Sequence, residues 1–214
     1  MFIFSRSITG IFKERKNQVK KILNKFQKDK ELYLAAQKEG VWLPIVQIAS
    51  VHYAIKLEGY DEPFNDEWEQ KLEYDGFNIE IKDSLWISSI SKFHEFDANG
   101  FCGDKVSYQT YDGVTLYSAY KYDVPSGKYL LSIKGYARKQ QLDSSNSNYG
   151  FAFSLVKVEE FKGYKNPRES DDYEFNLNWL TKSKGSSNIL VFRGRGRKKR
   201  TSGRREILPN DRIG

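Results

Sequence analysis

Histidine and cysteine, which often serve as catalytic groups and as metal ligands, are rare in this sequence. Only two histidines occur, His52 and His94, and the one cysteine, Cys102, has no basic neighbour to stabilise a thiolate. The sequence contains no Cys-x-x-Cys pair, no phosphate-binding glycine loop and no nucleophile elbow. We interpret both histidines as structural and expect a non-catalytic protein that has no metal and no cofactor.

The strongest chemical feature is a dense run of carboxylates, which we name the acidic segment, residues 58–75. Lys71 is the single basic residue within it. The carboxylates are Glu58, Asp61, Glu62, Asp66, Glu67, Glu69, Glu73 and Asp75. Such a surface steers a positively charged partner and raises its association rate.

The acidic segment has three interpretations. It is a solvated loop and helix face, a calcium site, or a contact surface for a basic protein. The sequence lacks the Asp-x-Asp-x-Asp-Gly pattern of a calcium loop, which disfavours the second. For the third, a nuclease is the favoured partner, because its positive cleft normally holds phosphates. The expected contacts are Asp61, Glu62, Asp66, Glu67, Glu69 and Glu73, with Trp68 as a packing residue.

The C-terminal region carries the opposite charge. It holds Arg193, Arg195, Arg197, Lys198, Lys199 and Arg200, with Arg204 and Arg205 close behind. Arginines alternating with glycines suit contacts to nucleic-acid backbones and bases. The alternative function is therefore nucleic-acid binding through this tail. The tail also allows a bland interpretation, a charged flexible end with no role.

Most of the chain has the alternating pattern of β-strands. Turn signals such as Asp75-Gly76, Asp112-Gly113 and Pro125-Ser126-Gly127 separate the apolar stretches. The expected strands are 51–57, 77–81, 85–90, 114–120, 129–133, 151–155, with a bulge at Val156, and 173–179. About seven short strands predict a mainly β fold, an antiparallel β-sandwich or a partly open barrel. On such a sandwich, exposed Tyr117 and Tyr120 would suit carbohydrate, a third class of function.

Two helices are expected beside these strands. Apolar residues at spacings of three and four predict a basic amphipathic helix that begins at Ser7 or Thr9 and stops at Gly40. Asn65 is a suitable cap for a short second helix, on which Trp68 and Leu72 share one face. A further strand is possible at 188–192.

Charge divides the chain into three regions. Residues 1–43 carry a formal charge of +6, residues 44–180 carry −8 and residues 181–214 carry +9, which together give +7. We therefore expect a basic amphipathic helix over 1–40, an acidic binding domain over 41–182 and a flexible basic tail over 183–214. One cysteine and no run of 18 apolar residues fit a cytoplasmic protein with no transmembrane segment.

Three stretches of the middle region resemble a known family. They are Ser50-Val-His-Tyr-Ala-Ile-Lys-Leu57, the segment from Asn65-Asp-Glu-Trp to Gly76-Phe-Asn-Ile-Glu80, and Tyr122-Asp-Val-Pro-Ser-Gly-Lys-Tyr-Leu-Leu131. Their order and spacing are similar to the competence protein J family, bacterial inhibitors of a DNA-entry nuclease, over residues 48–158. The resemblance implies a β-sandwich-like inhibitor with an acidic blocking surface, and an immunity protein against a nuclease toxin would look much the same. The basic helix and tail lie outside the resemblance.

Overall fold

The computed structural model of the chain describes residues 1–5, 22–94, 98–168 and 173–185. Its helices are α2 (Ile22–Lys28), α3 (Lys30–Lys38), α4 (Ser91–His94) and α5 (Leu177–Gly185), with a 3-10 turn η2 (Ala98–Gly100). Its strands are β1 (Phe2–Ser5), β2 (Trp42–Pro44), β3 (Tyr53–Leu57), β4 (Trp68–Ile81), β5 (Leu85–Ser88), β6 (Lys105–Gln109), β7 (Thr115–Tyr122), β8 (Gly127–Arg138) and β9 (Tyr149–Val158).

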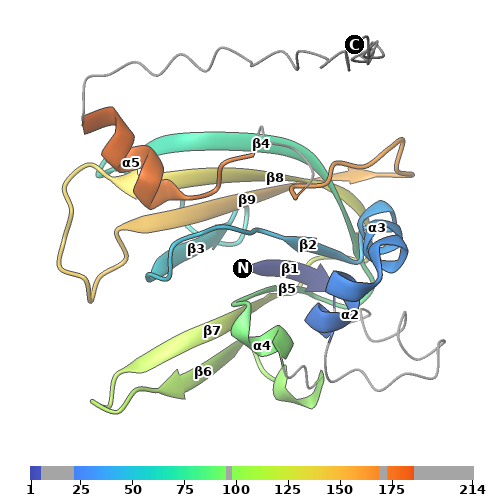
Figure 1. Ribbon diagram of the computed structural model, residues 1–214, viewed down its shortest axis with the longest axis horizontal. Coiled ribbons are helices and arrows are strands. Elements are labelled where there is room, and N and C mark those ends of the chain that lie inside the picture. Colours follow the sequence, from blue (N-terminus) through green and yellow to red (C-terminus); the bar gives the residue numbers. More distant parts are fainter. Residues whose placement is uncertain (6–21, 95–97, 169–172, 186–214) are drawn as a thin grey trace, which may run out of the picture.

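The strands form two sheets that face each other (Figure 1). One sheet has the order β2-β1-β5-β7-β6 and is antiparallel throughout. The other has the order β3-β9-β8-β4, in which β3 and β9 run parallel and the other pairs antiparallel. The sheets do not join into a closed barrel. The mainly β prediction is therefore confirmed.

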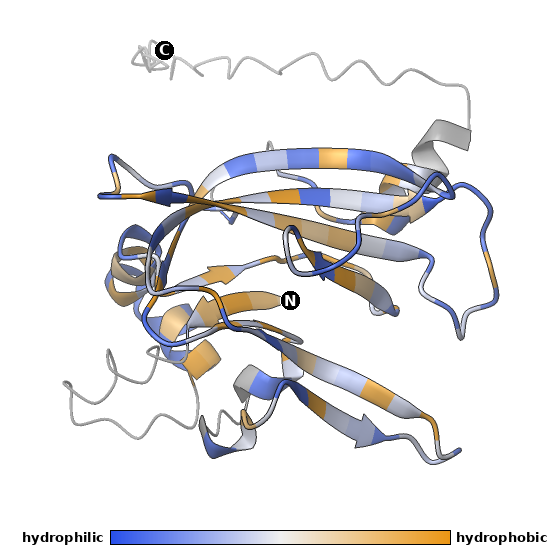
Figure 2. Ribbon diagram, turned by 180° about the vertical axis from the view of Figure 1, so that it is seen from behind, coloured by the Kyte–Doolittle hydropathy of each residue, from blue (hydrophilic) through white to orange (hydrophobic). Residues whose placement is uncertain are grey.

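The main core lies between the two sheets. On β8, every second residue from Tyr129 to Ala137 is buried and the residues between them are only partly covered, the alternation expected of a strand with one buried face. Ile3 and Ile87 of the opposite sheet belong to the same cluster. Figure 2 shows this alternation of hydrophobic and hydrophilic residues along the strands.

A second apolar cluster covers the outer face of the five-stranded sheet. Phe2, Phe4, Trp42 and Trp86 point away from the main core and meet α2 and α3, where Phe26 stacks on Trp42 at 4.3 Å between ring centroids. The central strands of this sheet are therefore buried on both faces. A strand that is buried on both faces has a continuous run of apolar residues. Its sequence lacks the alternation of apolar and polar residues that indicates a strand, so β1 and β2 are not predicted.

The N-terminal helix predicted from the sequence is present only as two separate helices within the described residues. The α2 helix ends at Lys28, and the Asp29 carboxylate caps α3 by accepting from the Leu32 amide at 2.9 Å. The α3 helix ends at Lys38, so Gly40 marks the stop as predicted. Residues 6–21, with the predicted caps Ser7 and Thr9, and residues 186–214, with the basic tail and the possible strand at 188–192, lie outside the described residues.

Two element predictions are wrong. The short helix expected after Asn65 is instead the start of β4, which pairs with β8 from Trp68 to Ile81 and has register shifts at 70/72 and 74/77. The strand expected at 173–179 is an extended approach to α5, which begins at Leu177. Also, β9 pairs with β8 in continuous register through Val156, with no bulge there.

Candidate functional site

The acidic segment begins in a tight turn that is tied to the other sheet. Gly59 has φ +85°, and the amides of Tyr60 and Asp61 donate to the carbonyl oxygen of Leu57 at 3.0 and 2.9 Å. The Asp61 carboxylate accepts from the Leu57 amide at 2.7 Å and from the Tyr122 hydroxyl at 2.9 Å. Asp61 therefore stabilises the turn, which is a structural role that the sequence does not reveal.

The chain then crosses the outer face of the four-stranded sheet. The Phe64 ring lies on Gly150, and a Cβ added to Gly150 would come within 2.4 Å of that ring. The centroids of the Phe64 and Trp68 rings are 4.7 Å apart. The Arg138 guanidinium covers the other part of Trp68 at 4.6 Å from the ring centroid and donates to Glu67 at 2.7 Å. Trp68 thus packs between Phe64 and Arg138 within the fold and stays partly exposed.

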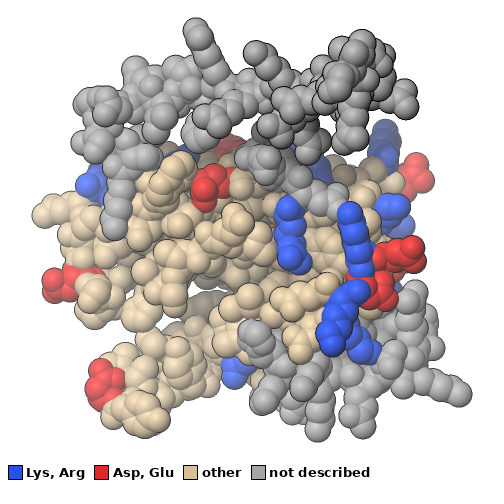
Figure 3. Space-filling view, in the orientation of Figure 1, with Lys and Arg blue, Asp and Glu red and all other residues tan. Residues whose placement is uncertain are grey.

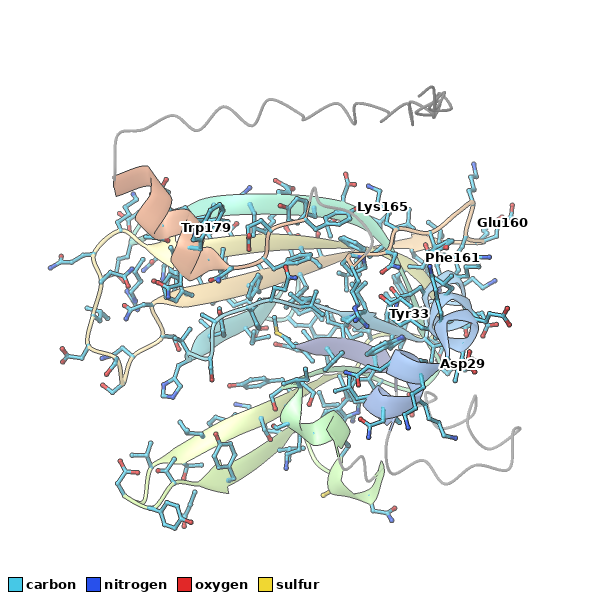
Figure 4. The ribbon with its side chains drawn as sticks, viewed as in Figure 1. Asp29, Tyr33, Glu160, Phe161, Lys165 and Trp179 are labelled. Carbon is cyan, nitrogen blue, oxygen red and sulfur yellow. The ribbon has the colours of Figure 1, made fainter. Side chains whose placement is uncertain are left out.

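Three further carboxylates of the segment lie along β4, an edge strand. Glu69 pairs with Lys71, Glu73 lies 3.9 Å from Lys134, and Asp75 lies 2.7 Å from Lys165. The hydrogen bond and positive charge of Lys165 hold the pKa of Asp75 below its usual range. Figure 4 shows Lys165 near the end of the sheet opposite Trp179 of α5.

The structure does not gather the six predicted contacts into one compact patch. Trp68 is opposite Arg138 on the outer face, whereas Glu69 is opposite Ala137, whose side chain belongs to the inner core, so the two point to opposite faces. Glu62 and Asp66 are exposed, and neither forms an ion pair with another of the residues that the structure describes. All eight carboxylates of the segment are nevertheless exposed.

An open cleft lies between the two sheets, and the sequence pattern does not predict it. Its volume is about 760 Å³. Its walls come from residues 48–55, from 87–91, from Tyr108 and 114–120, and from Ser145 and Ser147. Figure 3 shows the surface hollowed between the two sheets, with few charged side chains around it. Arg138 links this cleft to the acidic segment, because it also donates to the Ser147 carbonyl oxygen at 3.2 Å.

The cleft brings together the two tyrosines that the sequence analysis named for a carbohydrate site. Residues three apart on a regular strand point to opposite faces. A register shift opposite Val106 and Ser107 places an extra residue in β7, and the rings of Tyr117 and Tyr120 lie 5.9 Å apart. The Lys105 ammonium lies over both rings, at 5.2 and 5.8 Å from their centroids.

The residue types that catalysis or metal binding would need are dispersed in the part of the chain that the structure describes. No group of three or more His, Cys, Asp or Glu side chains is placed to hold a metal ion there. Cys102 is exposed, and His52 contacts the Ser145 carbonyl oxygen at 3.4 Å. None of the described helices is both long and apolar enough to cross a membrane.

Comparison of the chain with protein-family models, with curated proteins and with solved structures gives no match. The likeness to the competence protein J family therefore rests on the three quoted stretches alone. Two of them form β3 and β4, and the third forms the turn into β8.

Proposed function

We propose that this chain is a non-catalytic protein inhibitor that binds a basic partner, in the first instance a nuclease, through the acidic segment. The observation that carries the proposal is the exposure of all eight carboxylates between Glu58 and Asp75. Lys56, Lys134 and Arg138 of neighbouring strands and Lys165 of the segment after β9 add to Lys71, so the local charge is less negative than the sequence alone implies. The fixed turn at Asp61 and the packed Trp68 support a preorganised contact surface.

The residues that best test this proposal are Glu62 and Asp66, since they are exposed and are not engaged in the ion pairs described above. The full chain is immobilised, and an extract of the native host from which nucleic acid has been removed is passed over it. Retained material is then assayed for nuclease activity with added chain. We expect a nuclease to be retained and its activity to fall.

A matched pair of variants separates this surface from general charge. The Glu62→Lys/Asp66→Lys double variant should slow association with the retained nuclease by about tenfold or more at low salt, since rim charges act mainly on the association rate. The Glu159→Lys/Glu160→Lys variant makes the same charge change on exposed residues outside the segment and should behave as the native chain. Equal losses in both variants, or no retained nuclease, would contradict the proposal.

A further inference from the structure

The cleft between the sheets gathers large apolar side chains that remain exposed. Five large hydrophobic residues that stay 42–50 % exposed line it, namely Val51, Ile90, Tyr108, Val114 and Tyr117. They come from four separate parts of the chain, which the fold brings to one hollow. A concave apolar surface of this kind is typical of a binding site, whereas scattered exposed residues are not.

Charged side chains are also sparse at the cleft, where the Lys105 ammonium lies over the rings of Tyr117 and Tyr120. No Asp, Glu, Lys or Arg side chain is among the described residues that line the cleft. Met1 lies in its wall, and its α-amino group donates to the Ile45 carbonyl oxygen at 3.0 Å. Burial lowers the pKa of this amino group to about 5. A charged ligand would lose its water in the cleft, and no carboxylate or further ammonium in the described lining would offset that cost, so the lining favours an uncharged ligand.

An edge strand borders the cleft. The β3 strand is hydrogen-bonded to β9 on one side and is the edge of its sheet, and Tyr53 and Ile55 of this strand line the cleft. An edge strand offers its backbone groups to another extended chain. Side chains of alternate residues of that chain would meet the apolar walls.

These features distinguish a polypeptide from a sugar. The aliphatic side chains Ile48, Val51, Ile55, Ile87 and Leu116 dominate the walls beside the tyrosines. The polar side chains are hydroxyls and His52, and the lining lacks Asn and Gln as well as carboxylates. Planar amides and carboxylates give the paired hydrogen bonds that hold neighbouring sugar hydroxyls, so their absence from the lining disfavours carbohydrate.

We infer that the cleft is a binding site for an extended, uncharged, apolar segment of another polypeptide, which adds to the β3 edge. This inference rests on residues outside the acidic segment and does not require the proposed inhibition of a nuclease.

The test uses the full chain and a tethered peptide of about twelve residues with blocked ends, in which valine alternates with threonine. A matched peptide has two of its threonines replaced by proline, which removes backbone donors. We expect the first peptide to bind and the second to bind at least about tenfold more weakly. Maltoheptaose serves as the sugar probe, and its binding in place of the peptide would overturn the inference.

Two variants, each of which replaces a valine with lysine, test whether the peptide binds in the cleft. Val51→Lys places a charge at the cleft and should weaken peptide binding by about tenfold or more. Val156→Lys changes a valine that is 61 % exposed on β9 and is absent from the lining, so it should bind as the native chain. Thermal unfolding of both variants shows whether they fold. Equal binding by both variants overturns the inference. Binding by a chain that ends at Gly185 but not by the full chain also overturns it, because the site would then belong to residues 186–214.

Discussion

At the scale of single residues, the backbone conformation and the surroundings of position 40 favour glycine over any other amino acid. Gly40 has φ +67°, and its amide donates to the Gln37 carbonyl oxygen at 3.2 Å after the last turn of α3. An added Cβ would lie 2.9 Å from the backbone nitrogens of Ile79 and Glu80 in β4. Gly40 therefore both ends a helix, which its position after the periodic residues predicts, and allows close approach to a strand, which nothing in the local sequence predicts.

Replacing Gly40 with alanine should lower the free energy of unfolding by about 2 kcal/mol or more, because the left-handed backbone costs roughly 1–2 kcal/mol and the contact with β4 adds to it. Gly59→Ala is the control, since Gly59 has φ +85° and nothing lies within 4 Å of the added Cβ. Urea unfolding of the two variants measures the difference. A loss at Gly40 no larger than the loss at Gly59 would mean that the β4 contact relaxes freely.

Asp61 shows how a residue of the right type can serve the fold. Its carboxylate accepts from the Leu57 amide and the Tyr122 hydroxyl, and Tyr122 is only 9 % exposed. Burial, the hydrogen bond to Asp61 and the charge of Asp61 raise the pKa of Tyr122. The native state therefore keeps this proton at pH values where the unfolded chain releases it, above the ordinary tyrosine pKa of about 10.

This shift has a defined sign for stability. Since the folded pKa is raised, the contribution of Tyr122 is fully present below about pH 10 and is lost as pH rises beyond it. We expect the free energy of unfolding to fall more steeply between about pH 9 and 11 in the native chain than in Tyr122→Phe, measured by urea unfolding. At pH 7 the variant should lose about 1–2 kcal/mol for the missing hydrogen bond to a charged group. Equal slopes of unfolding free energy against pH in the native chain and in Tyr122→Phe would show that other groups determine the pH dependence.

At the scale of elements, periodicity predicts burial better than it predicts the type of element. Phe175 and Leu177 are buried, as the alternation at 173–179 indicates. Neither residue pairs with a strand among the described residues. Instead, α5 begins at Leu177, and Trp179 of this helix is 49 % exposed. The opposite mismatch occurs at the start of β4. A helix is predicted there from Asn65, Trp68 and Leu72, but the segment is a strand because β4 pairs with β8 over the full length of both strands. Such long-range pairing is absent from a local reading of the sequence.

The α2 and α3 helices should depend on one aromatic stack for their attachment. Phe26 is 3 % exposed and lies on Trp42, whose strand adds to the edge of the five-stranded sheet. Phe26→Ala should cost about 3–5 kcal/mol of unfolding free energy, because the lost apolar contact leaves a cavity beneath α2. Gln27→Ala changes the next, exposed residue of the same helix and should stay within about 0.5 kcal/mol of the native chain. Urea unfolding compares them, and equal stability of the two variants would mean that the stack carries no net energy.

At the scale of the whole molecule, the sequence predicts the distribution of charge along the chain and a mainly β fold but not the cleft. The acidic segment is recognisable because its carboxylates are consecutive in the chain. The cleft draws its residues from positions between Met1 and Ser147, and a register shift in β7 is what brings Tyr117 beside Tyr120. A surface assembled from distant segments has no local signature, so only the fold shows it.

The charge of the whole chain gives the last prediction. Residues 186–214 hold nine Lys or Arg and two Asp or Glu, so a chain that ends at Gly185 has a formal net charge of 0 in place of +7. If nucleic-acid binding is a function of this protein, the shorter chain should elute from single-stranded DNA at much lower salt, because fewer phosphate counterions are released.

A second variant separates charge from arginine chemistry. Replacing Arg193, Arg195 and Arg197 with lysine keeps the net charge but removes guanidinium stacking on bases. The dependence of affinity on salt should then stay as in the native chain, since it counts phosphate contacts, while affinity at each salt concentration falls. Unchanged binding by the chain that ends at Gly185 would instead place the contact in residues 1–43, whose formal charge is +6.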